Sequence, residues 1–248
     1  MSDEPVVSSP EMLKRAFDFL YSAAMRHSEE VATMRGDDIA PFYEGLFAES
    51  ERSIGILAFT FIEAQINERF AQHLSPAVKG GTEKIVGPNG ILDTVGKQIN
   101  MLDALRWIRP ETAQDLRLLA KIRNRFAHGH TALTFEDDTI QGYFSTLTKH
   151  EERCAEVGFT KDYPGVVLQT RHKYLIRAIG ALSALYLDLT LMPSSIRAGM
   201  GPTGAFGGDF DKYPLALRNA LGFCMETVNL IYRDAANIKP SANSGREK

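Results

Sequence analysis

Apolar residues recur every three or four positions along most of this chain, which is the spacing of one face of an α-helix. The strongest runs predict helices over residues 54–70, 91–105, 111–128 and 175–192. A shorter run predicts an earlier helix and consists of Leu13, Phe17, Leu20 and Ala24. No segment of comparable length alternates apolar and polar residues as a half-buried strand does. The pattern therefore predicts an all-α fold, in which antiparallel helices form a bundle.

Glycine and proline mark where these helices begin and end. Pro110 suits the first turn of the helix over 111–128, since proline there lacks only an N–H that has no partner within the helix. Residues 131–139 form a short polar break that carries either a strand pair or a loop. Beyond the bundle, the pattern predicts three further segments: a glycine-rich linker over 193–211, an additional helix over 212–236 and a disordered tail over 237–248. The bundle itself is expected to occupy residues 1–192.

Composition and charge narrow the functional classes. The chain has 248 residues and a formal net charge of −3, whereas proteins that coat nucleic acids through bulk charge are strongly basic. Cys154 and Cys224 form no C-x-x-C pair, so neither a disulfide framework nor a metal site is expected. The glycine pattern over 199–204 is not preceded by a predicted strand and contains Pro202, so no dinucleotide cofactor is expected. The start of the chain does not look like a signal peptide, and the apolar run over 175–192 includes charged residues, which favours a cytoplasmic protein without a membrane span.

The residues with the most chemical potential lie at the end of the third strong helix. Residues 121–128 read Lys-Ile-Arg-Asn-Arg-Phe-Ala-His, and Gly129 follows. Arg123 interrupts an apolar stripe made of Leu116, Leu119, Ala120 and Ala127. A buried guanidinium without its partner costs about 3–5 kcal/mol. The sequence therefore predicts that a carboxylate, a phosphate or a second chain meets Arg123.

Several motifs resemble those of the mannitol operon repressor family. They are the Gly87-Pro88 segment that leads into the second strong helix, the Glu49-Ser50-Glu51-Arg52 helix start, the 116–128 helix end, and more loosely residues 170–174. The resemblance covers residues 44–192 and departs from the family at Asp93 and at Val95-Gly96. More broadly, Arg123, Asn124 and His128 match the R-N-x-x-x-H signature of the HEPN superfamily of helical domains. The resemblance implies a helical bundle in which Glu63 faces Arg123.

Two interpretations of this motif remain open. In the structural one, Arg123 pairs with Glu63, Asn124 binds the last carbonyls of the helix, and His128 interacts with the helix dipole. In the catalytic one, Arg123 binds a phosphate, Asn124 belongs to the same site, and His128 transfers protons, with His130 as a second candidate. A neighbouring basic row along the helix is either a solvated face or a guide for a phosphate backbone, and consists of Arg117, Lys121 and Arg125.

The first functional hypothesis is a non-enzymatic regulatory protein of the mannitol repressor type that acts through protein partners in transcriptional control. The alternative is a metal-independent HEPN endoribonuclease that uses Arg123 and His128. Sequence-specific DNA binding by this chain alone is not expected, because no helix-turn-helix motif is evident. Both hypotheses predict a homodimer, since apolar residues fall on two sides of the motif helix. They differ over His128, which a nuclease must expose and a structural motif would bury.

Overall fold

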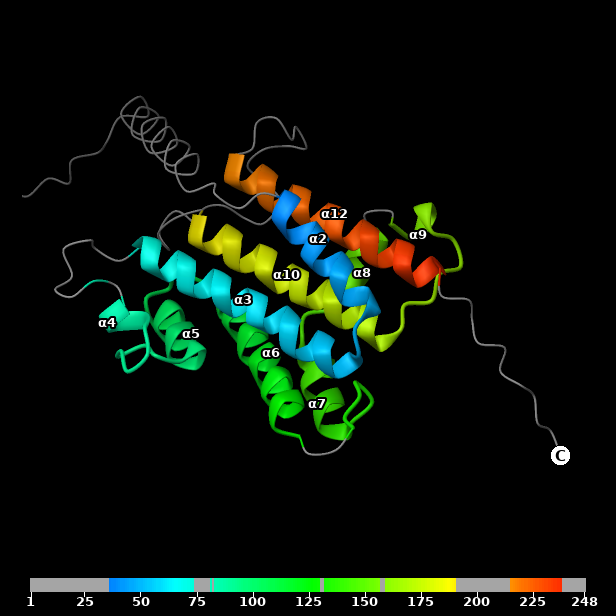
Figure 1. The fold of residues 1–248 in the computed structure, drawn as a ribbon. Coiled ribbons are helices and arrows are strands. Elements are labelled where there is room, and N and C mark those ends of the chain that lie inside the picture. The colour runs from blue at the N-terminus through cyan, green and yellow to red at the C-terminus, as the bar shows by residue number, and fades with distance from the viewer. Residues whose placement is uncertain are drawn as a thin grey trace, which may run out of the picture.

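The computed structural model describes residues 36–73, 81, 83–129, 132–156, 159–190 and 215–237. These residues form helices and connecting turns and contain no β-strand, which confirms the predicted all-α bundle (Figure 1). The predicted helix near residues 13–24, the linker over 193–211 and residues 238–248 of the tail lie outside the described residues. The helices are α2 (Gly36–Gly45), η1 (Leu46–Ala48), α3 (Glu51–His73), α4 (Glu83–Val86), α5 (Val95–Ala104), α6 (Pro110–His128), α7 (Asp138–Thr146), α8 (His150–Glu156), α9 (Phe159–Asp162), α10 (Thr170–Thr190) and α12 (Leu215–Asn237).

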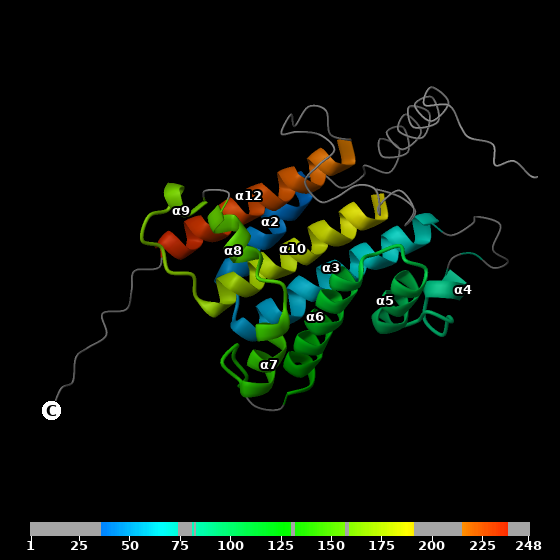
Figure 2. The ribbon, with the colours of Figure 1, turned by 180° about the vertical axis from the view of Figure 1, so that it is seen from behind.

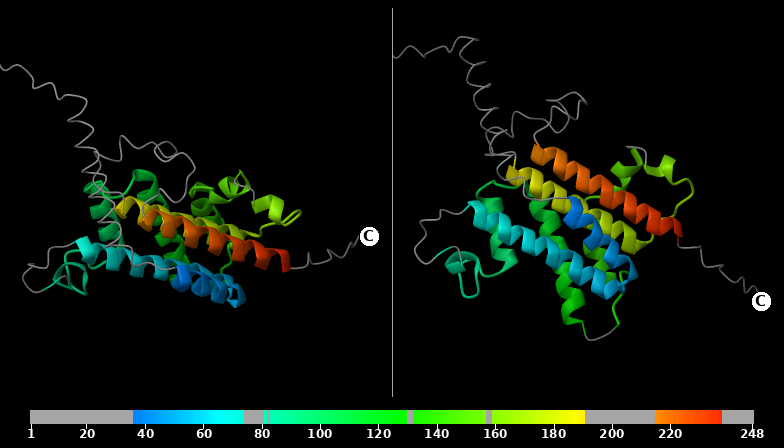
Figure 3. Two further views of the ribbon diagram at one scale, coloured as in Figure 1. Left: turned by 90° about the horizontal axis from the view of Figure 1, so that it is seen from above. Right: turned by 45° about the horizontal axis from the view of Figure 1, so that its top comes forward.

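The long helix α10 lies at the centre of the bundle. It packs against α12, α3, α6 and α8, and α12 in turn packs against α2. Figures 1 and 2 show α12 and α3 on either side of α10. In both views α6 and α7 extend below these helices. Figure 3 shows the same helices from above (left) and with the top of the view tilted forward (right). Residues 174–183 of α10 are all buried, as expected for a helix surrounded by others.

The core extends beyond the four helices predicted to form it. α2 contributes Ile39 and Tyr43, and α12 contributes Phe223, Ile231 and Tyr232. The polar break predicted over 131–139 forms no strand pair in its described part, and α7 begins within it at Asp138. The Asp137 carboxylate caps this helix by accepting hydrogen bonds from the amides of Thr139 and Ile140. Sequence periodicity missed α7 because a helix of this length shows little more than two turns of pattern.

A buried carboxylate determines where α6 begins. Asp188 of α10 is 3% exposed and accepts hydrogen bonds from the backbone and the guanidinium of Arg109, both at 2.8 Å, and from the Thr112 hydroxyl at 2.7 Å. The first amides of a helix have no partners within it, and their positive field favours an anion. Asp188 therefore acts as the N-terminal cap of α6 from another helix, 79 residues away in sequence.

Close packing fixes how α3 crosses α6. A β-carbon on Gly55 would lie 2.2 Å from the Phe126 ring, which is far inside van der Waals contact. Phe126 is fully buried and its ring packs edge-on against Phe135 at 5.1 Å between centroids. Only a glycine at position 55 lets the two helices approach this closely while Phe126 keeps its place.

We expect Gly55→Ala to lower the free energy of unfolding by about 1–3 kcal/mol, as overpacked core positions do. The matched control is Gly142→Ala in α7, because no atom lies within 4 Å of a β-carbon built there. That change should raise stability by about 0.5–1 kcal/mol, since alanine is the better helix former. Urea unfolding of the two variants measures both effects, and equal changes of one sign would contradict this packing.

His172 joins the start of α10 to the end of α12. Its side chain is fully buried; Nδ1 accepts a hydrogen bond from the Gln169 amide at 3.2 Å, and Nε2 lies 3.1 Å from the Asp234 carboxylate. Nδ1 must be unprotonated to accept that bond, so the neutral ring fits the site. Burial lowers the pKa of His172, although the hydrogen bond and charge of Asp234 oppose this shift and Arg171 adds to it.

A histidine whose pKa is lower in the folded chain stabilises the fold above its unfolded pKa of about 6.5. This contribution is lost as the pH falls from that value through the folded pKa, because the unfolded chain then binds more protons. We therefore expect His172→Gln to be less stable than the wild type at pH 7.5, with the difference shrinking at pH 5.5. Thermal unfolding at both pH values tests this, and a difference that grows on acidification would contradict it.

Candidate functional site at the end of α6

The motif occupies the last two turns of α6, and its apolar residues are core residues. Ile122 and Phe126 are fully buried. Phe126, Phe135 and Tyr174 form a run of aromatic contacts, with 4.7 Å between the centroids of the last two rings. The polar residues of the motif are therefore displayed from a rigid support.

The segment that follows the motif is anchored through Phe135. Its backbone amide donates to the Glu51 carboxylate of α3 at 2.7 Å, and its carbonyl accepts from the Gln141 side chain of α7, also at 2.7 Å. Gly129 lies close beneath Leu133, since a β-carbon on it would fall 2.2 Å from that side chain. The described part of the connection between α6 and α7 is thus held by α3, α7 and the core.

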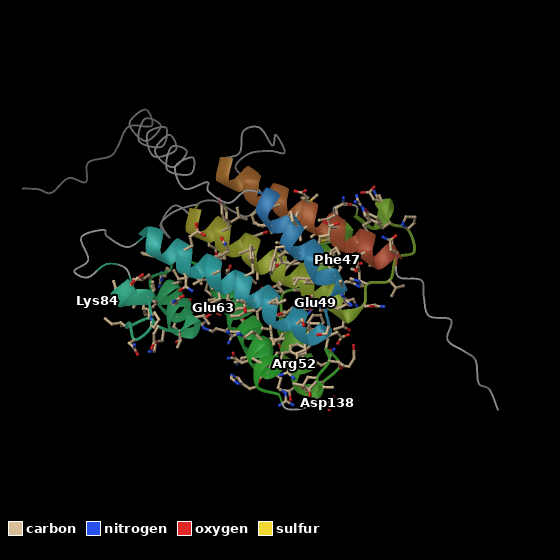
Figure 4. All side chains as sticks on the ribbon, in the orientation of Figure 1. Phe47, Glu49, Arg52, Glu63, Lys84 and Asp138 are labelled. Carbon is tan, nitrogen blue, oxygen red and sulfur yellow. The ribbon has the colours of Figure 1, made fainter. Side chains whose placement is uncertain are left out.

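Arg123 pairs with Glu63 across α3 and α6, as the sequence predicts. Its Nη2 lies 3.4 Å from the Glu63 carboxylate, and its Nη1 donates to the Asn124 side chain at 2.9 Å. The two charged side chains are 31% and 27% exposed. The sequence predicts a buried pair, but the observed pair is only partly buried. The Nε of Arg123 is buried and has no hydrogen-bond partner among the described residues. Glu63 can be located along α3 in Figure 4.

Asn124 does not bind the last carbonyls of α6, contrary to the structural interpretation. Its side-chain oxygen accepts from Arg123 instead. Two of the last carbonyls of α6 have other partners. The Arg52 guanidinium of α3 donates to the Ala127 carbonyl at 3.3 Å, and the Gly129 amide donates to the Arg125 carbonyl. The sequence around Arg52 does not indicate this role, since only the crossing of α3 over α6 brings Arg52 to the end of α6 (Figure 4).

His128 is exposed at the end of α6. Within the described part of the chain it forms no hydrogen bond or ion pair, which distinguishes it from the other polar residues of the motif. This exposure meets one requirement of a proton-transfer group and does not fit a buried structural histidine. His130, the second candidate, lies outside the described residues.

The basic row along α6 is held by neighbouring side chains. Arg117 binds Asp103 at 2.6 Å, Arg125 binds Asp137 at 3.2 Å, and the Lys121 ammonium lies 5.5 Å from the centre of the Tyr143 ring. The hydrogen bond from Arg125 is the main reason that the pKa of Asp137 lies below its usual value, with the amides that it caps adding to the shift. The row is thus neither simply solvated nor a free basic track.

Other chemistries find little support in the described residues. No group of three or more histidine, cysteine, aspartate or glutamate side chains there is arranged to hold a metal ion. Burial raises the pKa of Cys154 to about 12 and also raises that of Cys224, so neither thiol is a ready nucleophile.

The two apolar sides of α6, on which the prediction of a homodimer rests, are both covered within one chain. Leu116, Leu119, Ile122 and Phe126 are fully buried and Leu118 is 9% exposed, while Ala120 packs against the core as a partly buried residue. α3, α5, α7 and α10 all contact α6 and together cover its two apolar sides. A homodimer therefore has no uncovered apolar side of α6 to explain it.

No family model, curated protein or solved structure matches this chain. Within the described residues, no helix combines the length and the apolar character that crossing a lipid bilayer requires.

We expect the Arg123–Glu63 pair to contribute less than the 3–5 kcal/mol of a deeply buried pair. Both side chains are partly exposed, so solvent screens their attraction and a coupling of about 1 kcal/mol or less follows. A double-mutant cycle with Arg123→Ala and Glu63→Ala measures this coupling directly. A coupling above about 3 kcal/mol would show that the pair is shielded from water as a buried pair is.

Proposed function

We propose that this chain is a non-enzymatic regulatory protein of the kind that the mannitol operon repressor resemblance implies, acting through protein partners in transcriptional control. The observation that carries the proposal is the pairing of the three α6 arginines with carboxylates: Arg123 with Glu63, Arg117 with Asp103 and Arg125 with Asp137. A helix whose arginines are neutralised in this way offers weak attraction to a phosphate backbone.

The chemistry of RNA cleavage explains why this pairing matters. Cleavage without a metal needs positive charge directed at the phosphate, together with an acid and a base. Arg123 is the candidate for the charge, but Glu63 and Asn124 already accept from both terminal nitrogens of its guanidinium. Binding a phosphate would require this network to open. The arrangement supports a role in which the motif holds α3 and α6 together.

A metal-independent endoribonuclease is the second candidate, and a specific observation favours it. His128 is exposed and has no hydrogen-bond or ion-pair partner among the described residues, so its imidazole is accessible to a substrate. One such histidine supplies either the acid or the base. The nuclease therefore needs a homodimer that brings two copies of His128 together, which is a proposal of its own because the apolar sides of α6 are covered.

An RNA-cleavage assay in the presence of a chelator, with wild type and His128→Ala, separates the two functions. We expect no cleavage that depends on His128. When the wild type and His128→Ala are each expressed in cells, the same set of transcripts should change in abundance. Removing a true acid or base costs about 100-fold or more in rate. Chelator-resistant cleavage that falls by that factor in His128→Ala would overturn the regulatory proposal and support the nuclease.

A further inference from the structure

The turn at the end of α5 has an unusual residue in a strained position. The amide of Trp107 donates to the Leu102 carbonyl, and the amide of Arg106 donates to the Asp103 carbonyl. This pair of bonds is the Schellman ending of a helix, which calls for a left-handed residue and is usually completed by glycine. Here the left-handed residue is Arg106, with φ of 55°.

An arginine at this position is less stable than a glycine, because its β-carbon crowds the following carbonyl. Strained residues that a fold retains are found preferentially at functional sites, where their side chain is needed. Besides the arginine itself, the described residues include one other non-glycine with positive φ, Asn89, and asparagine tolerates that conformation well. Arg106 is therefore a place to ask what the side chain does.

Two exposed apolar side chains precede Arg106 in the chain. Met101 and Leu105 lie one turn apart on the outer face of α5 and are 37% and 47% exposed. Trp107, the single tryptophan of the chain, follows Arg106 directly; it is half-buried and packs against the core. Tryptophan and arginine are the residue types most enriched among those that dominate binding energy at protein interfaces, and methionine is also enriched there. We call Met101, Leu105, Arg106 and Trp107 the α5 corner.

Three basic residues near Arg106 in the chain or on the neighbouring helix are already paired within the described part of the structure. Lys97 is paired with Asp93 at 2.7 Å, Arg109 with Asp188 at 2.8 Å, and Arg117 with Asp103 at 2.6 Å. Arg106 is exposed and has no carboxylate partner among the described residues. An occupant that covers the apolar side chains would gain most by bringing a carboxylate to this guanidinium.

We propose that the α5 corner binds an amphipathic helix of a partner protein, with the helix placing apolar residues on Met101 and Leu105 and a glutamate or aspartate on Arg106. This rests on the proposed function and names the surface through which a protein partner is recognised. The helix form follows from the spacing of these two side chains, since exposed residues one turn apart match the spacing of apolar residues along a facing helix. The arginine stays in its strained turn because glycine would remove the charge that selects an acidic partner.

Trp107 makes the proposal directly measurable. The probes are two synthetic helical peptides without tryptophan, identical in a stripe of leucines and differing in whether glutamates or lysines flank it. We expect the glutamate peptide to shift the emission of Trp107 saturably, and the lysine peptide to bind at least 10-fold more weakly. Arg106→Gly and Met101→Gln should each weaken the glutamate peptide at least 10-fold.

Two controls separate recognition from folding. Met225→Gln changes the same residue type at similar exposure, 48%, on α12, and should bind the glutamate peptide as the wild type does. Arg106→Gly should raise the melting temperature by about 2–4 °C, as expected for relief of a strained residue in a chain of this size. Higher stability together with weaker binding is a combination that a purely structural Arg106 does not produce.

Three outcomes would overturn the proposal: no saturable shift with either peptide, equal affinity for both, or unchanged binding by Arg106→Gly. Sedimentation tests whether the occupant is a second copy of this chain. Self-association that disappears in Arg106→Gly would assign the surface to that copy instead of a partner protein. None of these results bears on RNA cleavage, which is tested through His128. Failure at the α5 corner is therefore distinguishable from failure of the proposed function.

Discussion

The buried carboxylate of Asp188 is the constraint on which the placement of α6 depends. An ionised group at 3% exposure is stable only if hydrogen bonds replace its lost hydration. Among the described residues, the donors to this carboxylate come from the start of α6, namely Arg109 and Thr112. The central helix α10 therefore fixes the beginning of α6, and a helix of defined length then carries the motif to a defined place.

The far end of α6 is fixed independently, through α3. Gly55 admits the Phe126 ring, Arg52 caps the Ala127 carbonyl, and Glu63 holds Arg123. These three contacts are spread along α3, so they set both the distance and the angle between the two helices. The motif is thus part of the framework of the bundle. His128 is the exception, since it lies just beyond the last of these contacts and its side chain is exposed.

Periodicity was sufficient to predict the long helices because each presents three or more turns of apolar residues. The interruption of the apolar stripe at Arg123 predicted that this residue needs a partner, and the expectation that the partner is Glu63 came from the motif resemblance alone. Periodicity failed where the decisive partner comes from a distant segment. Nothing in the local pattern around Arg52 indicates that it caps α6, and nothing around Asp188 indicates that it begins it. The exposure of Arg123 was misjudged for the same reason, because an interruption in an apolar stripe does not reveal how closely the facing helix approaches.

Contacts within the chain account for the apolar residues of α6 from which a dimer is expected. Apolar residues on two sides of α6 imply two contacts, and the sequence alone does not say whether both lie in one chain. The bundle supplies both of them, since α6 contacts α3, α5, α7 and α10. α12 does the same for α10, whose Tyr186 packs edge-on against Phe223 at 6.0 Å between ring centroids. Without α12 that face of α10 would be uncovered, so α12 is part of the core of this bundle.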